Sequence, residues 1–285
     1  MERLHRRGQR LITGQGAESS LSDRDFIAFQ RMINDLAGIY LADSRRTLVV
    51  ARLGKRLREL GLTSFNAYRL RLEAGTDPAE RQKFIDLLTT NETYFFREPP
   101  HFDLLRERIA PDLLQRRQPV RVWSAACSTG EEAYSIAMVL SDEFGNSLDW
   151  EVFGTDINHA VIDTARRGHF RMDRLDMMPA GCLRNYCLKG TGQHEGTLLI
   201  ERSIRKHTFF EPMNLAAPIP DVGLFDVIFL RNMLIYFRPE KKREIVQRVA
   251  RHLREDGWLI IGHSESLRGM DDALSVVTPS VYRWT

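Results

Sequence analysis

The sequence contains few cysteines and no long hydrophobic run. Its three cysteines, Cys127, Cys182 and Cys187, provide no disulfide framework and lack the spacing of a usual metal-binding motif. No apolar stretch reaches the roughly 18 to 20 residues that cross a bilayer. Residues 1–10 are charged and have no apolar core of the kind found in secretion signals. These absences predict a cytoplasmic protein with no metal site and no direct insertion into a membrane.

A large excess of charge of one sign is also missing. The chain has 41 basic and 38 acidic residues, and its net charge of +3 is too small to indicate nucleic-acid binding. Hydrophobic residues make up 43% of its 285 positions, which is enough for a substantial core. This composition is typical of a globular protein with one large domain or two modest ones.

The residue pattern divides the chain into three regions. Residues 1–20 are polar and basic, which predicts a flexible lead-in. Residues 21–90 show helical spacing of apolar side chains after a helix-start signal at Ser22, and predict an all-α domain. Glycines expected to end its short helices are Gly38, Gly61 and Gly75.

Strands and helices alternate in residues 91–285. The β-rich runs are 120–125, 150–156, 225–230 and 257–262, and the helical segments lie near 131–144, 157–167 and 239–254. This alternation predicts an α/β domain with a mostly parallel, Rossmann-like sheet. The alternation is interrupted at about 169–211 by glycine-containing, strand-like sequence, where we expect a small antiparallel β insertion.

A strand-to-helix turn in this region carries the first functional signal. The run 120–125 leads through small residues into a helix, and the next strand ends on Asp156, whose carboxylate can accept hydrogen bonds from a ribose. Only Gly130 matches the glycines of a dinucleotide-binding fingerprint, because Ala125, Ala126 and Ser128 replace the others. The departure argues against NAD and suits S-adenosylmethionine, a nucleoside with no phosphate to hold.

Six segments together resemble the chemotaxis receptor methyltransferases, the CheR family. They are residues 88–98, 122–135, 154–158, 213–215, 225–237 and 262–265, and their order and spacing cover nearly the whole chain from Ser20 onward. The resemblance implies a class I methyltransferase fold that transfers methyl groups from S-adenosylmethionine to receptor glutamates and releases S-adenosylhomocysteine. Ala133 departs from the family, which often has proline there, without affecting an expected site residue.

The resemblance also implies a cofactor site. Its members are Asn91, Thr93, Arg97, Glu132, Asp156, Asn214, Leu215, Arg231 and Asn232. Glu131 competes with Glu132, and its alternative role is a helix N-terminal carboxylate. Arg97 and Tyr236 are the catalytic candidates, because a cation and a hydroxyl can orient an attacking carboxylate. A glutamate with a pKa of about 4.3 is already ionised and needs no general base. The Asn/Asp-Pro-Pro-aromatic motif of base methyltransferases is missing, which favours an oxygen nucleophile.

Two further patterns concern the methyl-accepting substrate. Residues 44–58 contain six basic residues and no acidic one, and the stripe formed by Arg45, Arg52, Lys55 and Arg56 is implied to dock on acidic receptor helices. Its alternatives are a solvated helix face or a nucleic-acid contact. The loop 189–196 with Gly190, Gly192 and Gly196 resembles the family loop that binds a peptide at the receptor C-terminus, and a simple tight turn is its alternative. His194, Glu195 and His263 are given no metal or acid–base role.

The predicted function is glutamate methyl ester formation on chemotaxis receptors for sensory adaptation. Its expected partners are the cytoplasmic domains of these receptors, including a C-terminal tail peptide, and no nucleic acid. An RNA or DNA methyltransferase is the alternative enzyme. A nucleotide-sensing adaptor that kept the fold and lost turnover is the non-catalytic alternative.

Overall fold

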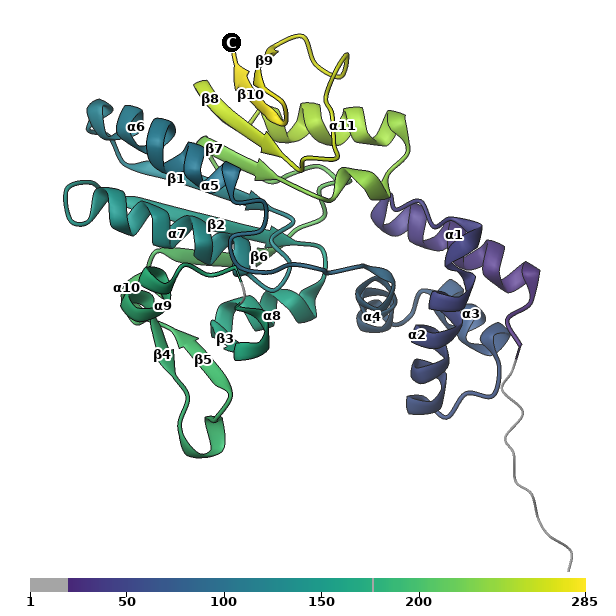
Figure 1. The fold of residues 1–285 in the computed structure, drawn as a ribbon. Coiled ribbons are helices and arrows are strands. Elements are labelled where there is room, and N and C mark those ends of the chain that lie inside the picture. The colour runs from purple at the N-terminus through teal and green to yellow at the C-terminus, as the bar shows by residue number, and fades with distance from the viewer. Residues whose placement is uncertain (1–19, 176) are drawn as a thin grey trace, which may run out of the picture.

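The computed structural model describes residues 20–175 and 177–285, which form a helical domain followed by a sheet domain (Figure 1). Apart from residue 20, the lead-in predicted for residues 1–20 lies outside this range. Figure 1 shows the helical domain beside the end of the sheet toward which the central strand arrows point. Among the described residues, no helix is long and apolar enough to cross a membrane.

Four helices pack around an aromatic core in the N-terminal domain. They are α1 Asp23–Ala37, α2 Arg46–Glu59, α3 Phe65–Ala74 and α4 Pro78–Leu88. The Ser22 side chain accepts a hydrogen bond from the Asp25 backbone and begins α1, as its sequence predicts. Gly38 ends α1 with a φ of 71°, a conformation that glycine adopts at little cost. The rings of Phe29, Tyr68 and Phe84 meet at the centre of this domain.

A seven-stranded sheet confirms the predicted Rossmann-like class. Its strands, in spatial order, are β6 Thr208–Pro212, β2 Trp150–Asp156, β1 Val120–Ala125, β7 Phe225–Leu230, β8 Leu253–Ile261, β10 Val281–Trp284 and β9 Leu274–Thr278. The first five are parallel, and β10 and β9 add an antiparallel hairpin at one edge. The sequence did not predict this hairpin.

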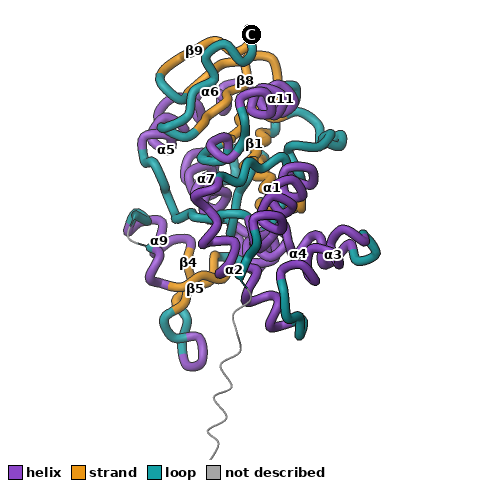
Figure 2. Tube along the Cα trace, turned by 90° about the vertical axis from the view of Figure 1, so that its right-hand side faces the viewer, coloured by secondary structure: helices purple, strands orange, loops and turns teal. Residues whose placement is uncertain are grey.

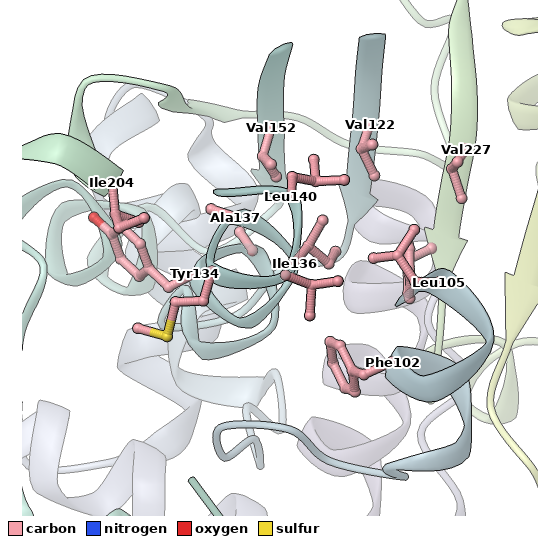
Figure 3. Close-up of a cluster of buried hydrophobic side chains, with 14 of the residues drawn as sticks. Phe102, Leu105, Val122, Tyr134, Ile136, Ala137, Leu140, Val152, Ile204 and Val227 are labelled. Atoms are coloured by element: carbon pink, nitrogen blue, oxygen red, sulfur yellow. The ribbon is translucent and has the colours of Figure 1, made fainter. Parts of the chain in front are cut away.

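Helices cover both faces of the sheet. One face packs against α7 Glu131–Phe144 and the segment formed by α5 Pro100–Leu104 and α6 Ala110–Arg116. Figure 3 shows Ile136 and Leu140 of α7 directed toward valines of three neighbouring strands. The other face packs against α11 Pro239–Ala250. A further helix, α8 His159–Arg167, follows β2.

A small antiparallel sheet forms the predicted insertion. It consists of β3 His169–Arg171, β5 Thr197–Ile200 and β4 Cys187–Lys189 in that spatial order, with α9 Ala180–Tyr186 and α10 Arg202–Arg205 beside it. In Figures 1 and 2 the insertion projects from the body at the end opposite β9. The expected range 169–211 extends too far, because β6 pairs with β2 and belongs to the main sheet.

Candidate active site

A cavity of about 1000 Å³, open mouth included, lies where the two domains meet. One wall consists of the carboxyl ends of β1, β2 and β7, which is where open α/β sheets usually bind ligands. The opposite wall includes Ala37 and Ile39 from the helical domain. The cavity is lined by all the residues expected to bind the cofactor or act in catalysis, namely Asn91, Thr93, Arg97, Glu132, Asp156, Asn214, Leu215, Arg231, Asn232 and Tyr236.

The turn between β1 and α7 brings its backbone close to the cavity. Three of its residues have left-handed backbones, with φ values of 72° at Ala126, 51° at Ser128 and 99° at Gly130. A β-carbon on Gly130 would lie 2.8 Å from that of Ala165, so this position requires glycine. Ala126 and Ser128 adopt the same region despite their side chains, at a cost that the surrounding contacts must offset. The single glycine found in the sequence is therefore sufficient for this turn.

Asp156 is held rigidly at the end of β2. Its carboxylate accepts hydrogen bonds of 2.9 Å from the backbone amides of Ser128 and Asn158, and the residue is only 8% exposed. Burial raises the pKa of Asp156 to about 6, so the group remains mostly ionised at pH 7. An oriented carboxylate in a cavity is suited to accept hydrogen bonds from a ribose diol.

Arg231 connects three elements around the cavity. Its guanidinium pairs with Glu132 of α7 at 2.9 Å and with Glu98 at 3.0 Å, and it also donates to the backbone oxygen of Arg97. Ser124 donates to the other oxygen of Glu132 at 2.6 Å. Burial raises the pKa of Glu132, and the neighbouring Arg231 cation opposes that shift. Since the Arg231 side chain is 1% exposed, its position is fixed by these contacts.

Two acidic residues that the sequence analysis gave no role hold this region together. Glu98 accepts a hydrogen bond from the Asn232 side chain at 3.0 Å, in addition to the Arg231 pair. Although burial opposes ionisation, the Asn232 hydrogen bond and the Arg231 cation lower the pKa of Glu98 to about 2. Glu265 accepts 2.8 Å hydrogen bonds from the backbone amides of Asn232 and Gly262. Both acids lie in segments that carried the family resemblance. Their position in these segments was the only feature of the sequence that could have indicated a role for them.

The two catalytic candidates enter the cavity from different elements. Arg97 donates to the backbone oxygen of Glu92 at 2.7 Å, and its guanidinium lies 5.8 Å from the centre of the Tyr94 ring. Tyr236 ends the short helix η5 Leu234–Tyr236, and its backbone oxygen accepts a 2.8 Å hydrogen bond from Tyr40 of the helical domain. Both side chains are half-buried at the cavity wall.

Glu131, the competing candidate, is oriented differently from Glu132. It is fully buried in the first turn of α7, and the Thr129 hydroxyl donates to it at 2.5 Å. It does not line the cavity, whereas Glu132 does. The geometry therefore favours Glu132 as the residue near a cofactor.

The basic stripe runs from Arg45, the last residue of the short helix η1 Asp43–Arg45, into α2, and it divides into two kinds of residue. Arg45 and Lys55 are exposed. Arg52 instead donates to the backbone oxygens of Leu87 and Thr89. Arg56 pairs with the buried Glu80 at 2.6 Å. These latter two side chains hold the helical domain and its connection to the cavity together.

The glycine loop lies in the insertion, apart from the cavity. A β-carbon on Gly190 would lie 2.0 Å from the His194 backbone oxygen, which excludes any side chain there. Gly192 and Gly196 have φ values of 58° and 75°, and the sequence analysis expected such a backbone at Gly192.

Comparison with known proteins places this geometry in a family. Residues 24–89 match the family model described as "CheR methyltransferase, all-alpha domain", and residues 91–283 match "CheR methyltransferase, SAM binding domain". The chain belongs to the CheR methyltransferase family. The protein is a methyltransferase that depends on S-adenosylmethionine.

Curated relatives of this CheR methyltransferase span almost its full length. A chemotaxis protein methyltransferase of Escherichia coli (strain K12) is 42% identical over 265 residues, covering 92% of this chain and 91% of the relative. Chemotaxis protein methyltransferase 2 of Pseudomonas aeruginosa is 40% identical over 261 residues, covering 90% and 92%. Among solved structures, a glycopeptide N-methyltransferase complexed with sinefungin has 15% identity and a TM-score of 0.33, covering 62% of this chain and 57% of that one. A likeness at this level carries no argument about substrate.

Proposed function

We propose that this protein transfers the methyl group of S-adenosylmethionine to glutamate side chains of chemotaxis receptors, forming methyl esters and S-adenosylhomocysteine for sensory adaptation. The observation that carries the proposal is the convergence of Asp156, Arg97 and Tyr236 on one cavity between the two domains. The names of the curated relatives support the class of substrate. We place this activity in the cytoplasm, on the cytoplasmic domains of the receptors.

The residues around the cavity fit the parts of this cofactor. We assign Asp156 to the ribose hydroxyls, since its carboxylate is oriented and mostly ionised at neutral pH. Asn214 and Leu215 would flank the adenine, and Glu132 would lie near the amino-acid end or the sugar. Asn91, Thr93, Arg231 and Asn232 complete the cofactor wall.

The chemical step requires positioning more than proton transfer. When bound, the cofactor supplies a methyl group on a positively charged sulfur. Arg97 would pair with the incoming glutamate carboxylate, and the Tyr236 hydroxyl would fix its orientation. Because both domains wall the cavity, their closure on the substrate would exclude water from the attacking oxygen.

The direct test is incubation with radiolabelled cofactor and receptor-containing membranes, followed by alkali. A methyl ester releases its label as volatile methanol, whereas methylated bases keep theirs. Receptor in which the methylated glutamates are replaced by alanine is the matched control. Alkali-stable label on RNA or DNA would support the alternative enzyme, and cofactor binding without any transfer would support the adaptor.

The insertion provides a second contact in this proposal. Both β3 and β4 pair only with β5 among the described strands, so each presents a free edge. The exposed Leu188 of β4 adds an apolar contact at one of these edges. We propose that a C-terminal receptor peptide adds a strand here, aided by the loop with Gly190, Gly192 and Gly196, and raises the local receptor concentration.

Titration of receptor-tail peptides tests this tethering separately from the chemistry. We expect a Kd in the micromolar range, about −8 kcal/mol, for the wild-type protein. Gly192→Val should weaken the peptide because its backbone has a positive φ, while cofactor affinity remains unchanged. Absence of saturable binding at millimolar peptide would mean that the enzyme works untethered.

A further inference from the structure

Three potential metal ligands converge beside the cavity. Glu98, His101 and His263 each offer one ligand atom, and these atoms lie within 4.8 Å of one another. The Glu98 carboxylate lies 3.4 Å from Nδ1 of His101 and 4.0 Å from Nδ1 of His263. A metal site was not predicted from the sequence, and His263 was given no chemical role, because His263 lies far along the chain from Glu98 and His101.

The hydrogen bonds of His101 determine which of its ring nitrogens carries hydrogen. Its Nε2 lies 2.8 Å from the Ser280 hydroxyl, which in turn donates its single hydrogen to the backbone oxygen of Pro279 at 2.5 Å. The hydroxyl therefore accepts from His101, and Nε2 is the protonated nitrogen. Nδ1 is left with a lone pair. The histidine is 2% exposed, and Nδ1 has no hydrogen-bond partner.

Nδ1 of His101 lies 3.4 Å from Oε2 of Glu98 and makes no hydrogen bond with it. Two acceptors that face each other repel unless a cation lies between them. Glu98 accepts three hydrogen bonds, from Arg231, Asn232 and the His263 backbone. Oε1 accepts from Asn232, and Oε2, the oxygen near both histidines, accepts from Arg231 and the His263 amide, so a cation bound to Oε2 replaces one of these latter two hydrogen bonds. The His263 side chain is 48% exposed and leaves this position open to solvent.

We propose that Glu98, His101 and His263 bind a divalent transition-metal ion of the zinc type, with water as a fourth ligand. Zinc prefers this set of imidazole nitrogens and a carboxylate oxygen. Ligands at the usual distances of about 2.0–2.2 Å in a tetrahedron lie roughly 3.3 Å apart. The Glu98–His101 separation already fits, and His263 closes the remaining gap by a small side-chain movement. Ser280 orients the His101 ring, as outer partners of metal-binding histidines do.

Arg231 lowers the affinity that we expect this site to have for a metal ion. Its guanidinium lies 3.0 Å from the same Glu98 oxygen and repels a metal ion. We therefore expect micromolar affinity, weaker than that of structural zinc sites. The metal ion would bind the Glu98 carboxylate, which also accepts hydrogen bonds from Arg231 and Asn232. Glu98 would therefore belong to the metal site and also hold two residues that line the cavity.

Calorimetric titration of the full chain with zinc chloride, without cofactor or receptor, tests the site. The wild-type protein should bind one ion, and His263→Ala should bind it at least tenfold more weakly. His263 suits this test because its exposed side chain can be removed without opening the core, and thermal melting checks that the variant is folded. Cobalt(II) should give a four-coordinate visible spectrum in the wild-type protein and not in this variant.

Two control variants exclude other ligands. His159→Ala removes an exposed histidine outside the cluster, and Cys187→Ser removes a partly exposed thiol. Both should bind zinc as the wild-type protein does. The proposal is overturned if wild-type protein takes up no zinc at millimolar concentration, or if His263→Ala binds it equally well. Neither result bears on methyl transfer.

Discussion

At the residue scale, the buried carboxylate of Asp156 lowers the stability of the fold, and it is the group that we expect to bind the ribose. Burial raises its pKa from 3.8 to about 6, so the protonated carboxyl group favours the fold below pH 3.8, and this contribution is lost as the group ionises and the pH rises through 6. A shift of this size corresponds to about 3 kcal/mol. At neutral pH the cavity therefore holds an anion that burial disfavours, and hydroxyl donors of a bound ribose would relieve that cost.

Asp156→Ala should weaken S-adenosylmethionine binding by about 1.5–3 kcal/mol, because charge-assisted hydrogen bonds are lost. Wild-type affinity should also fall between pH 7 and pH 5, as protonation removes acceptor capacity from the carboxyl group. Calorimetry at several pH values measures both effects. If the folded variant binds the cofactor as tightly as the wild-type protein, Asp156 does not belong to the cofactor site. The same conclusion follows if the affinity of the variant falls with pH as steeply as that of the wild-type protein.

Arg97 and Tyr236 should affect turnover more than cofactor binding. Arg97→Ala should lower kcat at least tenfold, about 1.4 kcal/mol of barrier, because the attacking carboxylate loses its cation. Tyr236→Phe should keep the fold and most cofactor affinity and still slow transfer. Initial rates with receptor, compared with Arg116→Ala on the exposed surface of α6, measure the effect. Wild-type rates in both cavity variants would contradict these roles.

The sequence predicted the residues that line the cavity better than those that hold them. Asp156 ends a strand and Gly130 marks a turn, so local pattern was enough to find both. Glu98 contacts Arg231, 133 positions away, and Glu265 contacts Asn232, 33 positions away. Contacts at such separations depend on the folded sheet, and no local sequence pattern predicts them.

At the scale of elements, α2 contributes a buried ion pair to the fold and exposed basic side chains to the surface. Arg56 and the Tyr68 hydroxyl both bond to Glu80, which is 3% exposed. Arg56→Ala should therefore cost about 3 kcal/mol of stability, because a buried carboxylate would lose its partner. Denaturant unfolding measures this loss, and Lys55→Ala on the exposed side of the same helix is the control. A similar midpoint for both variants would exclude the structural role.

Reversing Arg45 and Lys55 to glutamate should impair receptor methylation without disturbing the fold. Both side chains are exposed, and we expect the rate at low receptor concentration to fall roughly tenfold through weaker encounter. Added salt should reduce wild-type methylation, since exposed charges are screened over about 10 Å at 0.1 M. Arg116→Glu with Lys206→Glu makes the same charge change elsewhere. Equal rates in the two double variants would indicate a solvated face on α2.

The strands were predictable where both faces are buried. Runs 120–125, 150–156 and 225–230 match β1, β2 and β7 in full, because short runs rich in β-branched and aromatic residues predict strands. The strand β8 begins at Leu253, whereas the sequence predicted a start at residue 257. The first half of β8 is charged, and such a sequence does not predict a strand. The assignment of β6 to the insertion failed because pairing with β2 is a long-range choice.

At the scale of the whole molecule, hydrogen bonds join the two domains around the cavity. The Asn214 side chain donates to the backbone oxygen of Leu36 at 2.9 Å, and the Asn158 side chain donates to that of Asp86 at 3.1 Å. With the Tyr40–Tyr236 contact, these bonds place the end of α1 against the cofactor wall. The helical domain thus forms part of the cavity wall.

Cofactor product should stabilise both domains together. At 100 times its Kd, S-adenosylhomocysteine should contribute about 2.7 kcal/mol and raise the Tm by roughly 5 °C. Differential scanning calorimetry should show one transition that moves as a unit, because residues from both domains line the cavity. A ligand-independent first transition from the helical domain would show that the domains are uncoupled.

The insertion has a different relation to the rest of the molecule. None of the described residues between 169 and 205 lines the cavity, and the hairpin of β4 and β5 projects from the body (Figure 2). Mutations in this hairpin are therefore free of the constraints that the chemistry places on residues such as Asp156 and Arg231. Under the tethering proposal, a lineage would change the receptors it serves by altering this hairpin alone, and an engineer would exchange it as a cassette while the reaction stays the same.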